Sequence, residues 1–154
     1  MGLIQLSKPG LFTVVDDADH ARVNEYLWCP MKGSHGNVYA GAWIDGKKVR
    51  LHRLLLGSEG LVDHLNGNTL DNRRCNLRPC TFAGNSRNAG KRKHATSKFK
   101  GVSFHKEKKR WQARICYEYR EIHLGYFNRE RSAAVAYNKA ARKYFGEFAR
   151  LNKA

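Results

Sequence analysis

The stretch Val62-Asp63-His64-Leu65-Asn66-Gly67-Asn68 is the most informative part of this chain for its fold. Leu61-Val62 is β-prone and predicts a strand, and Asn66-Gly67-Asn68 predicts the turn that follows it. A second short strand or bend is expected over residues 77 to 81, and a helix over residues 82 to 88. The order is therefore strand, turn, strand, helix, with a carboxylate and an imidazole side by side on the first strand.

Asp63 and His64 suit metal-assisted hydrolysis of a phosphodiester. A carboxylate is an oxygen ligand for a hard cation, and an imidazole with a free pKa of about 6.5 can take a proton from water. Neighbouring strand residues point to opposite faces, so the two side chains serve one centre only if the chain twists or bulges there. The alternative interpretation is a polar turn without catalysis, because Asn and Asp also serve such turns.

Composition favours a folded protein with a polyanionic partner. The chain has 154 residues, 42% apolar content and a formal charge of +16, which allows one ordinary domain or two small ones. Such a charge suits nucleic acid or an anionic membrane surface, and no apolar run approaches the roughly 20 residues of a membrane span. The N-terminus lacks the layout of a secretion signal. We therefore expect a soluble, cytoplasmic protein that binds nucleic acid and no membrane.

The four cysteines are Cys29, Cys75, Cys80 and Cys116. Neither pair has the two-residue spacing that is typical of zinc knuckles, so we expect reduced thiols that behave as small apolar side chains. A zinc site made by Cys75 and Cys80 with histidine partners is the alternative.

The N-terminal part predicts one small antiparallel sheet. Short β-prone runs at residues 11 to 15, 38 to 43 and 48 to 51 alternate with turn formers. Starting signals and apolar spacing predict a short helix within residues 16 to 28, and a second short helix is expected over residues 52 to 56.

The C-terminal part predicts three strands and a helix. Strict alternation of apolar and polar residues runs through residues 102 to 104, 111 to 115 and 122 to 124. One face of this sheet is polar and mostly basic, and Trp111 belongs to the apolar face. Helical spacing over residues 129 to 145 predicts a helix that covers the apolar face and ends at Gly146.

The motif region resembles the HNH nuclease family, in the subgroup of phage and intron-encoded homing endonucleases. The match covers about residues 45 to 90 and includes Val62-Asp63-His64, Asn66-Gly67-Asn68, Asn76-Leu77-Arg78 and Asn85. The resemblance implies a ββα-metal fold and one divalent cation, Mg²⁺ or Mn²⁺, with no small-molecule cofactor.

The same resemblance implies a role for each matching residue. Asp63 and Asn85 would bind the metal, His64 would be the general base, and Asn76 would orient the imidazole. His52 is interpreted mainly as a packed, hydrogen-bonded histidine. The arginines expected to meet phosphates are Arg73, Arg74, Arg78 and Arg87.

Residues 97 to 152 resemble the Apetala-type DNA-binding domain of plant ethylene-response factors. The markers include Trp111-Gln112-Ala113-Arg114-Ile115 and Leu124-Gly125-Tyr126-Phe127. The resemblance implies that the exposed sheet face lies in the major groove of DNA. Its contact candidates are Lys100, Ser103, His105, Arg110, Gln112, Arg114 and His123, joined by Lys91, Arg92 and Lys93 of a basic linker. Ser103 and His123 depart from the plant pattern, so the plant target is not transferred.

These expectations define an α+β protein with an HNH domain at 1–88, a basic linker at 89–98 and an Apetala-type domain at 99–154. The expected function is that of a homing-type endonuclease, a monomer or weak dimer, that cuts double-stranded DNA in a bacterial or phage-infected cell. A non-cleaving DNA-binding regulator on a degenerate nuclease fold is the main alternative. An RNA-binding module is a third possibility.

Overall fold

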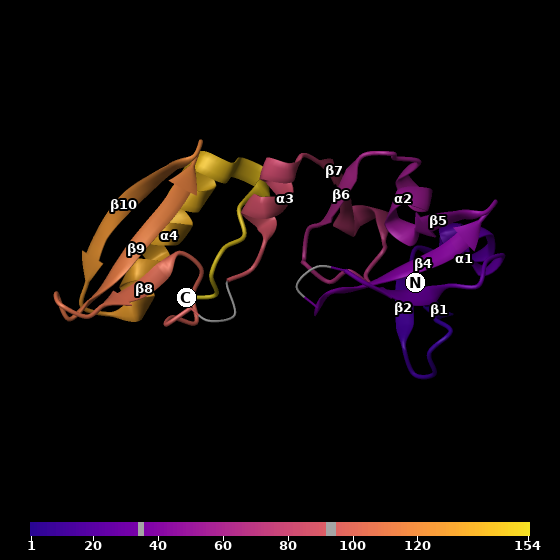
Figure 1. Ribbon diagram of the computed structural model, residues 1–154, viewed down its shortest axis with the longest axis horizontal. Helices are drawn as coiled ribbons and strands as arrows, with labels where there is room; N and C mark the ends of the chain where they lie inside the picture. The colour runs from indigo at the N-terminus through magenta and orange to yellow at the C-terminus, as the bar shows by residue number, and fades with distance from the viewer. Residues whose placement is uncertain (34–35, 92–94) are drawn as a thin grey trace. The chain divides into compact units, whose positions relative to one another are not determined.

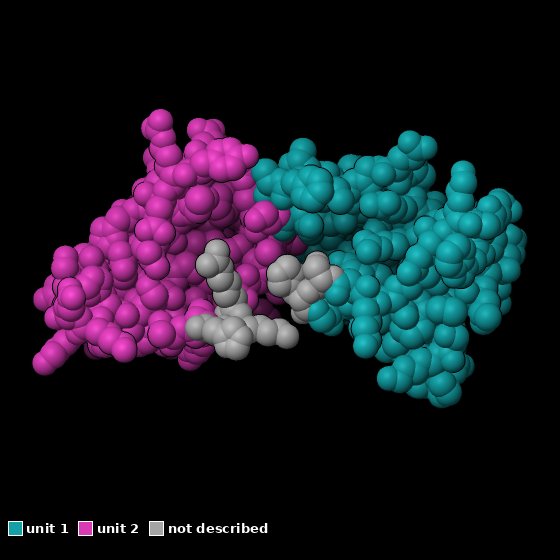
Figure 2. All heavy atoms as spheres, viewed as in Figure 1, with its two compact units in different colours: residues 1–85 teal, residues 86–154 magenta. Residues whose placement is uncertain are grey.

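The computed structural model describes residues 1–33, 36–91 and 95–154, and it divides into two compact units, Met1–Asn85 and Ser86–Ala154 (Figures 1 and 2). The elements are small antiparallel sheets and helices, so the α+β class is confirmed. Among the described residues, no helix is both long enough and apolar enough to cross a membrane.

Unit 1 begins with two small sheets where one was expected. Strands β1 (Gly2–Gln5) and β2 (Phe12–Val15) form an antiparallel pair, and β3 (Cys29–Lys32), β4 (Val38–Ile44) and β5 (Lys47–Arg50) form a second sheet. The prediction of a single sheet was wrong because it missed β1 and β3. Strand β3 contains Pro30, and it is an edge strand, which is where a sheet tolerates proline.

Two helices and a buried tryptophan complete the core of unit 1. Helix α1 (Asp17–Asn24) and helix α2 (Leu51–Leu56) lie within the predicted ranges or one residue beyond them. Trp28 is 1% exposed, and its Nε1 donates to the Val23 carbonyl at 2.7 Å. Each large apolar side chain buried in this way contributes roughly 1.5–3 kcal/mol to folding. Trp28 and Val23 belong to one apolar cluster, which also includes Leu77 of the hairpin described next.

The predicted strand–strand–helix order is present at the end of unit 1. Strand β6 (Leu61–His64) pairs antiparallel with β7 (Leu77–Cys80), and a 3-10 turn, η2 (Arg74–Asn76), precedes β7. Helix α3 (Phe82–Asn88) follows, and Thr81 begins it by accepting the Gly84 N–H on its hydroxyl oxygen at 3.1 Å. The ββα-metal assignment stays a prediction, because metal ligation defines that module.

Unit 2 contains the predicted three-stranded sheet and its helix. Strands β8 (Val102–His105), β9 (Arg110–Tyr117) and β10 (Arg120–Phe127) are antiparallel in the order β10-β9-β8. Helix α4 (Glu130–Phe145) packs on this sheet and ends at Gly146, which begins the 3-10 turn η3 (Gly146–Phe148). Ala113, Ile115 and Tyr137 are buried between sheet and helix.

A bulge in β10 changes which side chains reach the polar face. The pairing of β10 with β9 shifts between His123 and Gly125, and Gly125 has a φ of +124° that favours glycine. After the shift, Tyr126 stands opposite Gln112 on the polar face. Simple alternation from Leu124 would have placed Tyr126 on the apolar face instead.

Asn152 ties the C-terminal segment to the start of the sheet. Its Oδ1 accepts the Lys100 N–H at 2.7 Å, and its Nδ2 donates to the Lys100 carbonyl at 3.0 Å. The backbone of Asn152 bonds in turn to the side chain of Asn138 on α4 at 2.7 and 2.9 Å. The Asn152 side chain thus pairs with a backbone much as a strand would.

Replacing Asn152 with alanine is expected to destabilise unit 2 by about 1–3 kcal/mol, because two partly buried backbone groups of Lys100 would lose their partners. Chemical denaturation followed by tryptophan fluorescence measures this change. The neighbouring Lys153→Ala substitution is the matched control, since Lys153 is exposed. Equal stability of the two variants would contradict this role.

Candidate active site

Strand β6 places Asp63 and His64 at the end of the hairpin where the sequence predicted them. Asp63 stands opposite Arg78 of β7, and His64 stands opposite Leu77. Asp63 and His64 are 5% and 4% exposed. Arg78 donates from Nε and Nη2 to Oδ2 of Asp63 at 3.2 and 2.8 Å. The predicted metal ligand is therefore also half of a buried ion pair.

The imidazole of His64 is held by an amide and packed against two rings. Its Nε2 lies 3.2 Å from Oδ1 of Asn72. The ring centroids of His52 and Tyr39 lie 5.1 and 6.1 Å from that of His64. Burial lowers the pKa of His64, although the Asn72 hydrogen bond and the Asp63 charge act in the opposite direction. The ring is therefore kept in the neutral form that a general base needs.

His52 is buried as expected, at 3% exposure, and lies edge-on to both Tyr39 and His64. Burial, with a smaller contribution from His64, lowers the pKa of His52 to about 3. The sequence interpretation of a packed histidine is thus supported by its position in the core of the site.

Unit 1 is expected to lose stability as the pH falls from about 6.5 toward 3. In this range His52 binds a proton in the unfolded chain but not in the folded chain, where its pKa is about 3. Above pH 6.5 both states are neutral at this residue and the effect vanishes. Within the window the slope is about 1.4 kcal/mol per pH unit for one such group. Urea unfolding over this window would show a shallower slope for His52→Gln than for the wild type. Identical slopes would contradict this cause.

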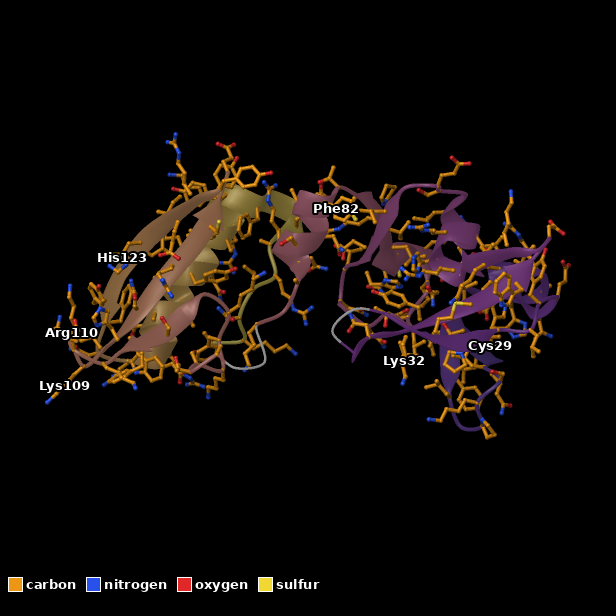
Figure 3. The ribbon with its side chains drawn as sticks, viewed as in Figure 1. Cys29, Lys32, Phe82, Lys109, Arg110 and His123 are labelled. Atoms are coloured by element: carbon orange, nitrogen blue, oxygen red, sulfur yellow. The ribbon has the colours of Figure 1, made fainter. Side chains whose placement is uncertain are left out.

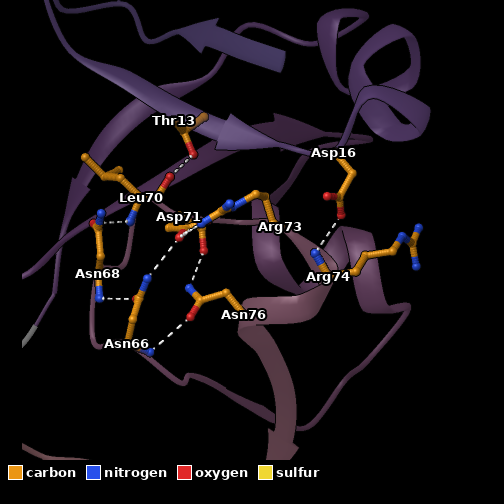
Figure 4. A network of polar contacts seen from close by, with 9 residues as sticks. All are labelled: Thr13, Asp16, Asn66, Asn68, Leu70, Asp71, Arg73, Arg74 and Asn76. Atoms are coloured by element: carbon orange, nitrogen blue, oxygen red, sulfur yellow. Dashed lines mark hydrogen bonds and ion pairs between the residues drawn. The ribbon is translucent and has the colours of Figure 1, made fainter. Parts of the chain in front are cut away.

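Asn76 organises the loop between β6 and β7. Its Oδ1 accepts the Asn66 N–H at 3.0 Å, and its Nδ2 donates to the Asp71 carbonyl at 2.7 Å (Figure 4). The His64 ring contacts the amide of Asn72, a residue to which the sequence analysis gave no role. Both polar groups of Asn76 bond to the loop backbone, and the orienting role predicted for Asn76 stays a prediction.

Asn85 is exposed on α3, and its N–H makes the helical bond to the Thr81 carbonyl at 2.9 Å. Phe82, at the start of the same helix, is 82% exposed (Figure 3). The hairpin thus brings Asp63, His64 and Asn76 together, while the helix that follows carries Asn85. The convergence of Asn85 on Asp63 stays a prediction.

Three of the four arginines expected to meet phosphates are paired with carboxylates. Arg73 donates to both carboxylate oxygens of Asp71 at 2.8 and 2.6 Å, and Arg74 donates to both oxygens of Asp19 at 2.7 Å. These hydrogen bonds lower the pKa of both aspartates, so the pairs stay ionised. With Arg78 on Asp63, these three guanidinium groups are paired with carboxylates of unit 1, and their contact with phosphates stays a prediction.

Arg87 and Lys100 also have partners inside the protein, in unit 2. The Arg87 guanidinium lies 5.4 and 5.5 Å from the ring centroids of Tyr117 and Phe145. Nζ of Lys100 donates to the carbonyls of Arg87 and Ala89 at 2.5 and 2.6 Å. Burial lowers the pKa of Lys100 to about 8. The ammonium group of Lys100 therefore lies at the end of α3, and its contact with DNA stays a prediction.

The other predicted DNA contacts gather on the polar face of the β8–β9–β10 sheet. Arg110 and His123 project from β9 and β10 (Figure 3). Gln112 and His123 share a hydrogen bond of 3.0 Å, and Arg114 is paired with Glu121 at 3.0 Å. Residues of this face are Ser103, His105, Arg110, Gln112, Arg114 and His123. Lys91 is exposed, and Arg92 and Lys93 lie outside the described residues.

Sequence reasoning missed Tyr126 and a groove beside it. The rings of His105 and His123 lie 5.4 and 4.5 Å from that of Tyr126, and Nζ of Lys108 lies 4.1 Å from its centroid. A groove of about 430 Å³ continues from this cluster and is lined by Arg110, Tyr126, Phe127, Asn128, Arg129 and Ser132. The isolated Gly125 within a strand pattern was the signal for the bulge that puts Tyr126 there.

The donors predicted for the cation fit it in kind, because a carboxylate and a carboxamide oxygen suit a hard divalent ion. Within residues 1–33, 36–91 and 95–154, no three His, Cys, Asp or Glu side chains are grouped so that they could hold a metal ion. The predicted Asp63 and Asn85 pair is a different donor set. All four cysteines are free thiols.

The chain is basic, has an α+β fold and carries a buried Asp-His pair at the end of a hairpin, and these features are typical of a nuclease. No family model matches the chain. It is 31% identical over 152 residues to an uncharacterized HNH endonuclease of Acanthamoeba polyphaga mimivirus, and the match covers 94% of this chain and 76% of that protein. The chain therefore belongs to the HNH endonuclease family.

Proposed function

We propose that this chain is a homing-type endonuclease that hydrolyses phosphodiester bonds of double-stranded DNA with His64 as the general base. The observation that carries the proposal is the His64 imidazole, buried beside Asp63 at the end of β6. The similarity to a protein named as an HNH endonuclease supports the same reaction class.

His64 would take a proton from the water that attacks the phosphate. The Asn72 amide and the rings of His52 and Tyr39 restrict the imidazole, so it is oriented before the substrate arrives. A positioned general base contributes typically about 10²- to 10⁴-fold to a rate. Family resemblance implies products with 5′-phosphate and 3′-hydroxyl ends.

Asp63 and Asn85 would hold one divalent cation, which when bound would stabilise charge on the phosphate and on the leaving oxygen. Arg78 donates two hydrogen bonds to Oδ2 of Asp63, at 3.2 and 2.8 Å, from across the hairpin. Arg78 would thereby fix the orientation of the carboxylate group that serves the cation.

The polar face of the unit 2 sheet would bind DNA, as the Apetala-type resemblance implies. Its support is the cluster around Tyr126 and the adjoining groove, where Arg110 and Arg129 present two guanidinium groups. The excess of lysine and arginine supplies affinity that should fall steeply with salt. One catalytic centre cuts one strand, so a double-strand break would need two protomers or sequential nicks.

Incubation of the full chain with supercoiled plasmid tests the proposal. With Mg²⁺ or Mn²⁺ we expect nicked or linear product, and with a chelator none. DNA that flanks the chain's own open reading frame is the preferred substrate for mapping the ends, and RNA of matching sequence is assayed at the same salt. Binding to duplex DNA without cleavage in either metal would reject the enzyme and favour the non-cleaving regulator.

A further inference from the structure

A line of hydrogen bonds joins His64 to strand β2 through two fully buried side chains. Beyond the 3.2 Å contact of His64 Nε2 with Asn72 Oδ1, Nδ2 of Asn72 lies 2.7 Å from Oγ1 of Thr13. That hydroxyl lies 2.8 Å from the carbonyl oxygen of Leu70 (Figure 4). Thr13 and Asn72 are 0% and 1% exposed, so their polar atoms depend on partners within the protein.

The Leu70 carbonyl determines the direction of every bond in this line. A carbonyl oxygen only accepts, so Thr13 donates its single hydroxyl hydrogen to Leu70. Oγ1 of Thr13 then accepts from Asn72, which places the Nδ2 side of that amide toward Thr13. The Oδ1 side faces His64 and accepts there. The neutral ring consequently carries its hydrogen on Nε2 and its lone pair on Nδ1.

The reverse arrangement would leave two buried oxygens in contact. If the Asn72 amide turned over, its oxygen would face Thr13, and one hydroxyl hydrogen would serve two acceptors. The Leu70 or the Asn72 oxygen would then lie within 2.8 Å of Oγ1 with no hydrogen between them. With the amide turned over, its Nδ2 would face the ring, and the Asn72 bond would favour the other tautomer of His64.

Backbone bonds hold the two segments of this line in place independently of the side chains. The Val14 N–H donates to the Leu70 carbonyl at 2.9 Å, and the Asn72 N–H donates to the Val14 carbonyl at 2.8 Å. Val14 and Asp71 form an isolated parallel bridge. Substitution of a single side chain should therefore change the amide orientation without moving the segments apart.

We infer that Thr13 and Asn72 are positioning residues that fix the tautomer of His64 and make Nδ1 the nitrogen that accepts the proton from water. In that step an O–H bond of water breaks, its proton goes to Nδ1, and the electron pair left on oxygen forms the new bond to phosphorus. The bond from phosphorus to the 3′-oxygen breaks, and that oxygen leaves with its electron pair and takes a proton from solvent. Nε2 keeps its hydrogen and its bond to Asn72 throughout. The catalytic part of this inference rests on the proposed function, whereas the tautomer does not.

The test is a long-range ¹H–¹⁵N correlation spectrum of the full chain with labelled histidines, recorded where the ring is neutral. The wild type should show His64 as the Nε2–H form. Thr13→Val should give a mixture of tautomers and slow plasmid cleavage by about 10- to 100-fold. Thr13→Ser should restore both. In the double variant Thr13→Val with Asn72→Asp, one carboxylate oxygen faces the His64 ring and the other faces residue 13. Either orientation of the carboxylate offers an acceptor to Nε2, so the Nε2–H form should return.

The matched control is Thr69→Val, which removes another hydroxyl that donates to a backbone carbonyl of unit 1, that of Val38. It should leave the His64 tautomer and the cleavage rate unchanged. A wild-type ring with its hydrogen on Nδ1, or a folded Thr13→Val variant that keeps the Nε2–H form, would overturn the inference. Thr13→Ala replaces Thr13→Val if valine prevents folding. A tautomer that responds as expected in a chain that never cuts DNA would support the tautomer assignment and reject both the catalytic part and the proposed function.

Discussion

Replacing His64 with alanine is expected to slow plasmid cleavage by about 10²- to 10⁴-fold while affinity for duplex DNA changes little. The loss follows because the substitution removes the imidazole that is proposed as the general base. Affinity is retained because it comes from lysines and arginines elsewhere in a chain of charge +16. Single-turnover cleavage rates measure the first effect, and filter or fluorescence binding without divalent metal measures the second.

His64→Gln accompanies the alanine variant because the side chain is 4% exposed, and its truncation leaves a cavity. Glutamine fills most of that space and can bond to Asn72, yet it cannot take up a proton. The control is His20→Ala on helix α1, which should cut at the wild-type rate. Cleavage by His64→Gln at the wild-type rate would reject His64 as the base.

Local patterns in the sequence predicted most elements of the fold. Strict alternation identified β9 and its neighbours, because each strand has one apolar and one polar face. Strands β1 and β3 were missed, since Gly2–Gln5 is short and Cys29–Lys32 contains a proline that argues against a strand. The bulge at Gly125 reversed the alternation in β10, which a period of two cannot anticipate.

The candidate site was predictable only where its residues are close in the sequence. Asp63 and His64 are adjacent and belong to a spaced motif, so their place at one end of a hairpin could be expected. Asn72 reaches Thr13 across 59 positions, and no local signal marks such a pair. Charge patterns likewise identified the arginines as basic, but the carboxylates that neutralise Arg74 and Arg78 come from segments distant in sequence.

Replacing Arg78 with methionine is expected to destabilise unit 1 by about 3–5 kcal/mol. Arg78 is 9% exposed and makes two hydrogen bonds to the buried carboxylate of Asp63, while methionine offers similar bulk without a charge. The Asp63 carboxylate would lose the charge of Arg78 and both of these hydrogen bonds in a poorly solvated place. Urea unfolding at neutral pH measures the change.

The exposed ion pair of Arg114 with Glu121 supplies a matched control, because its side chains are 43% and 62% exposed. Arg114→Met should change stability by less than about 1 kcal/mol, since solvent already screens that pair. The double variant Asp63→Asn with Arg78→Met should recover part of the loss, because a neutral amide no longer needs the guanidinium. If Arg78→Met were as mild as Arg114→Met, the buried pair would not stabilise the hairpin. The carboxylate proposed to serve the cation would then have to be held in place by its other contacts.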